Sequence, residues 1–257
     1  MPHLVGVALV IGAGSSYGRA VTSLLIENGC QKIILGDANE EELLRLQACF
    51  QGSDCARARV VSKTCDVNNA EDIDRIIEFG VAEFGAIDYC ANCESFNASK
   101  GQTTDITLEE FTQASDRWQK GTWLAMRAEV RHFLKQQEKN PSAIGSIVNI
   151  TAAQGLASDA GLPSHCAAAH GIVGMSRATA MDYVKKGIRI NCVCAGTPGA
   201  PGHDVHSQAD AFPRAPNDRH IAPEDVAHAV VFLLSEAASS ITGIELPVDG
   251  GWSLYHY

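Results

Sequence analysis

Three glycines directly after the first apolar run of the chain could bind a phosphate group. They lie in the segment IGAGSSYGRA, where a tight turn lets the backbone approach a pyrophosphate closely. A helix that begins at such a turn points its first N–H groups at the anion. The alternative reading is a plain strand-to-helix turn. The turn residues predicted to hold a dinucleotide are Gly12, Ser15, Ser16, Tyr17 and Gly18.

Acidic residues close the second and third apolar runs. Asp37 stands where a carboxylate accepts hydrogen bonds from ribose hydroxyls and repels a 2′-phosphate, which favours NAD over NADP. Asp66 and Val67 follow the third run, where they could contact the adenine ring. Asp66 could equally serve as a helix N-cap.

These residues need strands and helices to position them. Apolar runs at 4–11, 32–36, 58–64, 86–91, 145–150, 188–193 and 243–248 read as strands. Segments with helical spacing lie between them, and in 69–84 an apolar stripe follows a capping Asn69. Regular alternation with short connections predicts a single domain over residues 1–257, an α/β Rossmann-like fold with a doubly wound, parallel, seven-stranded sheet.

Length and charge restrict the possible classes of protein. A chain of 257 residues suits one domain with a full core. The formal net charge of −10 argues against nucleic acid or an anionic membrane as partner. No apolar run is long enough to span a bilayer, and the opening MPHLVGVALVIGAG lacks the basic start and cleavage site of a signal peptide.

The nine cysteines indicate a reducing, cytoplasmic location. Their number is odd and several lie in strand-like runs, so buried free thiols are favoured over disulfides. Cys90 and Cys93 form one C-x-x-C pair without a second pair at zinc spacing, which leaves a redox or metal role as the lesser alternative.

Several motifs together resemble the short-chain dehydrogenase/reductase family over nearly the whole chain. IGAGSSYGRA is similar to the family's glycine turn, IDYCANCES to its D-x-x-x-N-N-A-G segment, and GSIVNITAAQG to its serine strand. The segment from 164 to 201 resembles the tyrosine helix with the strand after it, and the ending APEDVAHAVVFLLSEAASSITGIELPVDGGW resembles the last helix and strand. The resemblance implies a nicotinamide cofactor and adds Asn92 to the cofactor-binding residues.

The chain departs from the family at the four catalytic positions. The family's Asn, Ser, Tyr and Lys correspond here to Trp118, Ala152, His165 and Ala169. The lysine and tyrosine of the family pass a proton and the serine orients the carbonyl, and Ala152 and Ala169 can do neither. Thr151 should point away because adjacent strand residues face opposite sides. Binding of NAD(H) is therefore expected to be weak or vestigial. The residues for the adenosine half of the cofactor agree better with the family pattern than those for the nicotinamide half.

His165 and Trp118 are the candidate catalytic residues. An imidazole titrates near neutral pH and could act as acid or base, or it could only fill the space of the tyrosine. Trp118 could offer a flat surface or simply pack. Glu94 would lie at the edge of the cofactor pocket, where it could act as a base or face solvent. His170 should point away from the cleft.

A long segment without a pattern, 196–222, is expected to be a substrate lid. It contains His203, Asp204, His206 and His220, whose spacing could bind a metal. A solvated loop is the favoured interpretation, so no metal is expected.

Three functions remain open. The first is a non-redox enzyme that isomerises, dehydrates or cyclises a natural-product-type small molecule. The second is a divergent NAD-dependent oxidoreductase with His165 as proton donor. The third is a catalytically silent binding scaffold. We favour the first, because complete loss of the four side chains fits a change of chemistry. The resemblance also implies a homo-oligomer, a tetramer or dimer, paired through the helices at about 107–138 and 164–186.

Overall fold

A computed structural model describes residues 4–52, 58–94, 99–196 and 221–255 of the chain. Its centre is a parallel seven-stranded sheet in the order β3-β2-β1-β4-β5-β6-β7. The strands are β1 (Val7–Ile11), β2 (Lys32–Asp37), β3 (Arg59–Thr64), β4 (Tyr89–Asn92), β5 (Gly145–Ala152), β6 (Ile188–Ala195) and β7 (Glu245–Val248). This confirms the predicted fold class.

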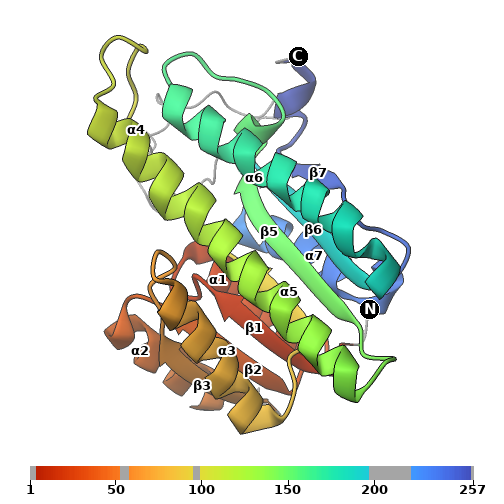
Figure 1. Cartoon of the computed structure of the whole chain (residues 1–257). Helices are drawn as coiled ribbons and strands as arrows, with labels where there is room; N and C mark the ends of the chain where they lie inside the picture. Colours follow the sequence, from red (N-terminus) through yellow and green to blue (C-terminus); the bar gives the residue numbers. More distant parts are fainter. Residues whose placement is uncertain (1–3, 53–57, 95–98, 197–220, 256–257) are drawn as a thin grey trace.

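Helices cover both faces of the sheet (Figure 1). They are α1 (Ser16–Glu27), α2 (Glu40–Gly52), α3 (Ala70–Phe84), α4 (Leu108–Ala114), α5 (Gly121–Lys139), α6 (Pro163–Tyr183) and α7 (Pro223–Leu234). Short helical turns lie at η1 (Ser115–Lys120), η2 (Ala153–Gly155), η3 (Val184–Lys186), η4 (Glu236–Ala238) and η5 (Trp252–Tyr255).

Alternating strand residues build the two halves of the core. Ala8 and Val10 of β1 pack in one cluster with residues of α1, α2 and α7. Val7, Leu9 and Ile11 pack in the other with residues of α3, α5 and α6. Because the side-chain period of a strand is two, one run of apolar residues serves both faces of the sheet.

The helix boundaries agree well with the sequence pattern, and the strand starts agree less well. Asn69 caps α3 through its side chain, as its position before the apolar stripe indicates. The strands predicted at 4–11 and 243–248 begin earlier than the observed ones, because β1 starts at Val7 and β7 at Glu245. An apolar run marks burial, whereas a strand also requires ladder hydrogen bonds to its neighbour.

One long helix contains an irregular segment that the sequence did not predict. Residues 107–138 were expected to form a helix, and the structure runs from α4 through η1 into α5. The middle piece η1 is a π-helix, and it carries Trp118. Such segments place one extra residue in a turn and occur frequently at functional sites.

The described ranges show no membrane span, since none of their helices combines sufficient length and hydropathy. All eight cysteines in these ranges are free, and only Cys49 is exposed. Most of the expected lid, residues 197–220, lies outside the described residues, as do His203, Asp204, His206 and His220.

Candidate active site

The carboxyl end of β1 marks the place where a ligand of this fold is expected. β1 pairs with β2 on one side and with β4 on the other, so the strand order reverses at β1. Crevices at such a reversal bind ligands in open α/β sheets. The glycine turn and the ends of β2, β3 and β4 meet there.

The glycine turn has the close packing that its spacing predicts. Gly12 has a φ of +73°, and a Cβ there would lie 2.8 Å from the backbone N of Glu94. A Cβ on Gly18 would lie 2.2 Å from the carbonyl oxygen of Gly12. Both positions therefore require glycine. Ser15 caps α1 by accepting a hydrogen bond from the Gly18 N–H at 2.9 Å, and its hydroxyl donates to the Cys93 carbonyl at 3.0 Å.

Asp37 and Asp66 stand beside this turn. The Asp37 carboxylate accepts from the Gly14 N–H at 2.8 Å and from the Asn39 N–H at 3.0 Å. Asp66 accepts from the backbone N–H of Asn68 at 2.9 Å and remains exposed. Asn69, not Asp66, is the N-cap of α3. Both carboxylates are thus fixed at the edge where an adenosine would lie.

Other predicted cofactor residues contribute less than expected through their side chains. Tyr17 points into the core, where its hydroxyl lies 3.5 Å from the Gly196 carbonyl and burial raises its pKa to about 12. Asn92 is buried and bonded to Glu129 and Asn149. Val67 packs against Gly121, while Ser16 is exposed at the start of α1. Tyr17 and Asn92 can therefore contact a cofactor only through their backbones.

His165 and Trp118, the candidate catalytic side chains, come together. Their ring centroids lie 5.0 Å apart with a tilt of 34°. The Trp118 indole N–H donates to the Glu94 carbonyl at 3.1 Å, which fixes the ring. η1 provides Trp118 and the first turn of α6 provides His165, two segments that the sequence separates by 47 positions.

His165 is neutral in this environment. It is 8% exposed, and its Nδ1 has no hydrogen-bond partner. Burial lowers the pKa of His165 to about 4, and the negative charge of Asp159 opposes this shift only partly. Asp159 itself accepts from the Gln154 side chain at 2.8 Å. An unpaired nitrogen in a buried ring is a group that a ligand could satisfy.

Apolar residues pack together where the family has its other polar catalytic side chains. Trp118 and Ala169 belong to one buried cluster on which Ala152 packs at the edge. Thr151, which was expected to point away from the catalytic position, has its hydroxyl 3.5 Å from the Ala169 carbonyl of α6. His170 is exposed, as predicted. The indole of Trp118 thus shares the space between η1 and α6 with alanines in place of longer polar residues.

Glu94 lies between the two halves of the site. Burial, with a smaller contribution from the negative charges of Asp37 and Asp66, raises the pKa of Glu94 to about 7, and Arg117 opposes this shift. A raised pKa keeps a proton-accepting role open for this carboxyl group.

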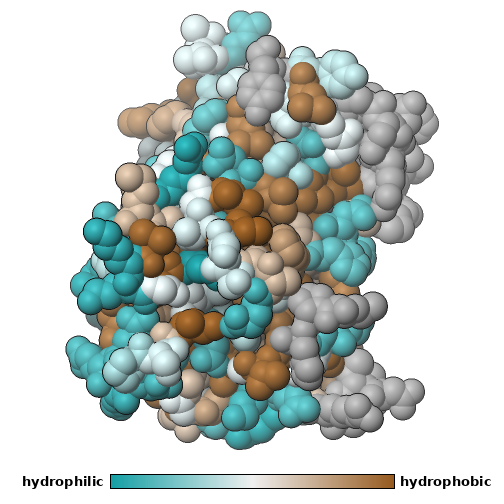
Figure 2. Space-filling model, turned by 90° about the vertical axis from the view of Figure 1, so that its right-hand side faces the viewer, coloured by the Kyte–Doolittle hydropathy of each residue, from teal (hydrophilic) through white to brown (hydrophobic). Residues whose placement is uncertain are grey.

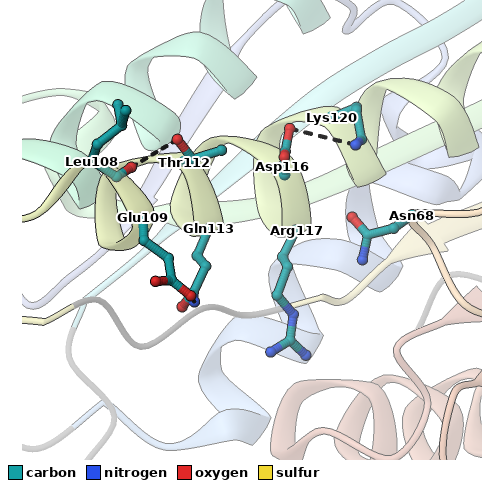
Figure 3. A pocket seen from close by; sticks show the side chains of 8 residues that line it. All are labelled: Asn68, Leu108, Glu109, Thr112, Gln113, Asp116, Arg117 and Lys120. Atoms are coloured by element: carbon teal, nitrogen blue, oxygen red, sulfur yellow. Dashed lines mark hydrogen bonds and ion pairs between the residues drawn. The ribbon is translucent and has the colours of Figure 1, made fainter.

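A surface pocket of about 630 Å³ lies along α4 and η1. Figure 3 shows Glu109, Gln113 and Arg117 projecting from successive turns toward its opening, with Asn68 on the other wall. Asp116 and Lys120 form an ion pair at 3.4 Å. Sequence reasoning missed Arg117, although its position directly before Trp118 could have indicated it.

The described residues contain no group of three or more His, Cys, Asp or Glu side chains that could hold a metal ion. Cys90 and Cys93 are both buried, and burial raises the pKa of each thiol well above its usual range. Neither thiol has the thiolate character that redox or metal chemistry requires.

The residues present fit the adenosine and pyrophosphate part of a dinucleotide. The turn between Gly12 and Gly18 leaves no room for side chains, and the first turn of α1 directs N–H groups outward. At the place where the nicotinamide would lie, the chain has Trp118, His165 and alanines.

Comparison with known proteins identifies the class. A family model described as enoyl-(acyl carrier protein) reductase matches residues 12–253, and the chain belongs to the short-chain dehydrogenase/reductase family. Membership supports an enzyme that binds a nicotinamide cofactor.

Similar proteins cover almost the same length. A 2,5-dichloro-2,5-cyclohexadiene-1,4-diol dehydrogenase of Sphingobium indicum is 31% identical over 98% of this chain and 99% of its own. A cyclohexanol dehydrogenase of an Acinetobacter species is 30% identical, over 96% of this chain and 94% of its own. Among solved structures, levodione reductase has a TM-score of 0.87 at 26% identity, covering 97% of this chain and 98% of that one.

These names overturn the favoured expectation of a non-redox enzyme. The relatives are called dehydrogenases and reductases, so the isomerase, dehydratase or cyclase interpretation is wrong, and the silent scaffold loses support with it. The error was to equate four side chains with the whole reaction. Hydride transfer depends also on holding two reacting carbons close together, and the four side chains alone say nothing about that.

Proposed function

We propose that the protein is an NAD(H)-dependent oxidoreductase that oxidises a secondary alcohol on a small, mostly apolar ring, with His165 as general base. The observation that carries this proposal is the unpaired Nδ1 of a buried imidazole, held against Trp118 at the family's tyrosine position. A candidate base must be within hydrogen-bond reach of the proton that it takes, and a buried ring nitrogen without a partner has its acceptor position open for a substrate hydroxyl.

The protonation state of His165 suits the role of a base. With a pKa near 4 the ring is neutral at pH 7, so it can accept a hydroxyl proton. A nicotinamide held at the glycine turn would supply the acceptor for the hydride of the carbinol carbon. His165 would take the hydroxyl proton as the alcohol becomes a ketone.

The packing around His165 supports an apolar ring as substrate. Trp118 belongs to the apolar cluster next to the imidazole, and Leu156 packs against this cluster. Ala152, which also packs there, adds no polar group. The relatives named for cyclohexanol and for a cyclohexadiene diol act on alcohols of this class by their names. A binding site lined by apolar side chains with one polar group would orient such a ring through its hydroxyl.

Asp37 supports a preference for NAD(H) over NADP(H), because its carboxylate would repel the 2′-phosphate of NADP(H). NAD(H) binds weakly in this proposal, because no hydroxyl or ammonium group stands at 152 and 169 to hold the nicotinamide ribose. Residues 196–222 would act as the substrate lid.

NADH formation from cyclohexanol and cyclohexanediols tests the function. The wild-type protein should reduce NAD⁺ with at least one of these alcohols. His165→Ala and His165→Gln should lower kcat by about 10²–10⁴-fold, the usual value of a positioned acid–base group. His170→Ala is the matched control, because His170 is an exposed histidine on the same helix. Full activity in His165→Ala would remove His165 from the mechanism. Absence of turnover with every ring alcohol, in protein that binds NADH, would overturn the proposed substrate class.

A further inference from the structure

A chain of hydrogen-bonded, buried polar side chains runs from α5 over the neighbouring strands β4 and β5 to α6. Asn92 of β4 donates through Nδ2 to Glu129 Oε2 at 3.1 Å and to Asn149 Oδ1 at 2.9 Å. Asn149 of β5 donates to the Ser176 hydroxyl of α6 at 2.8 Å. We call Glu129, Asn92, Asn149 and Ser176 the buried polar network. It joins α5, β4, β5 and α6 in one line of hydrogen bonds.

Two acceptor atoms in this network have no partner. They are Glu129 Oε1 and Asn92 Oδ1, and they belong to the two groups that already share one hydrogen bond. A carboxylate has no proton to donate, so a charged Glu129 cannot serve Asn92 Oδ1, and among the described residues the Cys90 thiol is the one other side chain that hydrogen-bonds the carboxyl group. A proton on Oε1 would make that atom a donor, and Asn92 Oδ1 is the unpaired acceptor on the group to which Glu129 is already bonded. The two groups would then form a two-point acid–amide pair.

The surroundings of Glu129 favour the neutral acid. Its side chain is 1% exposed, and no ion pair among the described residues includes it. The side chains that hydrogen-bond it are Cys90 and Asn92 from β4, both uncharged, and the network continues from Asn92 to uncharged Asn149 and Ser176. Asp88, farther along β4, acts on Cys90. Burial raises the pKa of Glu129 to about 7, and Asn92 and Cys90 oppose this only partly.

We propose that Glu129 is a positioning residue that folds as a neutral carboxylic acid paired at two points with Asn92, and that loss of its proton weakens cofactor binding. The link to the site runs along β4. Directly after Asn92, the Cys93 carbonyl accepts from Ser15 of the glycine turn and the Glu94 carbonyl accepts from Trp118. When Glu129 loses its proton, the O–H donor becomes an acceptor oxygen. This oxygen then repels Asn92 Oδ1, directly before Cys93 and Glu94.

The direction of the pH effect follows from the raised pKa. The folded chain takes up a proton between pH 4.5, the usual value for a glutamate, and about 7. The stabilisation is complete below pH 4.5 and is lost as the pH rises through 7. Affinity for NADH should therefore fall above neutral pH, by at most about tenfold per pH unit for one proton. This consequence rests on the proposed function, whereas the acid–amide pair does not.

Infrared spectroscopy tests the protonation directly. At pH 6 the wild-type protein should show more protonated carboxyl absorbance than Glu129→Gln, in which Glu94 is the remaining acid with a raised pKa in the described part of the chain, and this difference band should disappear as the pH rises past about 7. The glutamine is a close substitute for the neutral acid, because its amide can donate to Asn92 Oδ1 and accept from Asn92 Nδ2. Absence of this difference band at pH 6 would overturn the proposal.

Titration of NADH binding between about pH 6 and pH 9 tests the consequence. Wild-type affinity should fall at high pH, and this fall should be smaller in Glu129→Gln. Glu78→Gln on the exposed side of α3 is the control and should behave as wild type. Retention of the wild-type pH dependence by Glu129→Gln would overturn the link and point to Glu94. If no variant binds NADH at any pH, the proposed function fails, and the infrared result still decides whether Glu129 holds its proton.

Discussion

At the scale of single residues, His165 shows how much environment changes chemistry. A tyrosine at this position in the family passes a proton with the help of a nearby lysine. Here the place of that lysine is Ala169 inside an apolar cluster, so no positive charge assists the ring. Burial has the larger effect on the pKa of His165 and outweighs the charge of Asp159, so the ring does not acquire the charge that an exposed imidazole would acquire on mild acidification.

A nuclear magnetic resonance titration of the His165 ring should therefore show a neutral imidazole throughout the range from about pH 6 to pH 8. Its titration should begin only toward pH 4. Asp159→Asn should lower this midpoint further, because the Asp159 charge is what opposes the effect of burial. The exposed His170 provides the internal reference. A midpoint for His165 near 6.5 would show that the ring is hydrated rather than buried.

Asp37 carries the second prediction at this scale. Its two oxygens are fixed by the N–H groups of Gly14 and Asn39, at the place where the adenosine ribose would lie. Wild-type protein should bind NADH more tightly than NADPH in calorimetry. Asp37→Ala should narrow that difference, because the repulsion of a 2′-phosphate is lost. Tighter binding of NADPH by the unmodified protein would contradict this role of Asp37.

At the scale of elements, the apolar pattern predicted the strands and most helices, because burial and periodicity coincide there. It did not predict η1, since the residues Ser115–Lys120 contain neither Pro nor Gly to mark an irregular turn. What distinguishes this segment is a tertiary contact, the packing of Trp118 against His165 and the Glu94 carbonyl. Contacts between distant parts of the chain do not appear in a periodic pattern.

Trp118 is expected to stabilise the packing of η1 on α6. Trp118→Ala should lower the free energy of unfolding by about 3–5 kcal/mol, since a buried indole leaves a large cavity. Trp118→Phe keeps an aromatic ring but cannot donate to the Glu94 carbonyl, and it should cost about 1–3 kcal/mol because that oxygen loses its partner. Denaturant unfolding measures both values. Trp123→Phe, on the exposed side of α5, is the control and should change little. An unaffected Trp118→Phe would mean that the hydrogen bond contributes nothing.

At the scale of the whole molecule, the frame and the site differ in how far the sequence determines them. Gly12, Gly18 and Asp37 could be assigned because each is required by local geometry that a short motif encodes. The neutral state of His165 and the pairing of Asn92 with Glu129 could not, because they depend on burial and on helices more than 35 positions away. The prediction of a non-redox function failed for a similar reason. The loss of four side chains is visible in the sequence, whereas the similarity to dehydrogenases extends over almost the whole chain.

The surface of the molecule bears on its assembly. Figure 2, which turns the right-hand side of Figure 1 toward the viewer, shows apolar residues in separate patches between hydrophilic ones. Large apolar side chains are also exposed on the neighbouring helices α5 and α6. Trp123 of α5 is 44% exposed beneath the guanidinium of Arg127, and Met181 and Val184 at the end of α6 are 78% and 48% exposed. Such side chains are the kind that subunit interfaces cover.

The protein is accordingly expected to form a dimer or tetramer through α5 and α6. Sedimentation velocity at micromolar concentration should show the oligomer for wild type. Met181→Lys combined with Val184→Lys should shift it toward monomer, because two ammonium groups would have to be desolvated in a closed interface. Leu44→Lys is the control, since Leu44 is an equally exposed apolar residue on α2, away from both helices. A wild-type monomer under these conditions would contradict the assembly, and an oligomer that survives the double substitution would place the interface on another face. If dissociation leaves NADH binding intact, the cofactor site is complete within one chain.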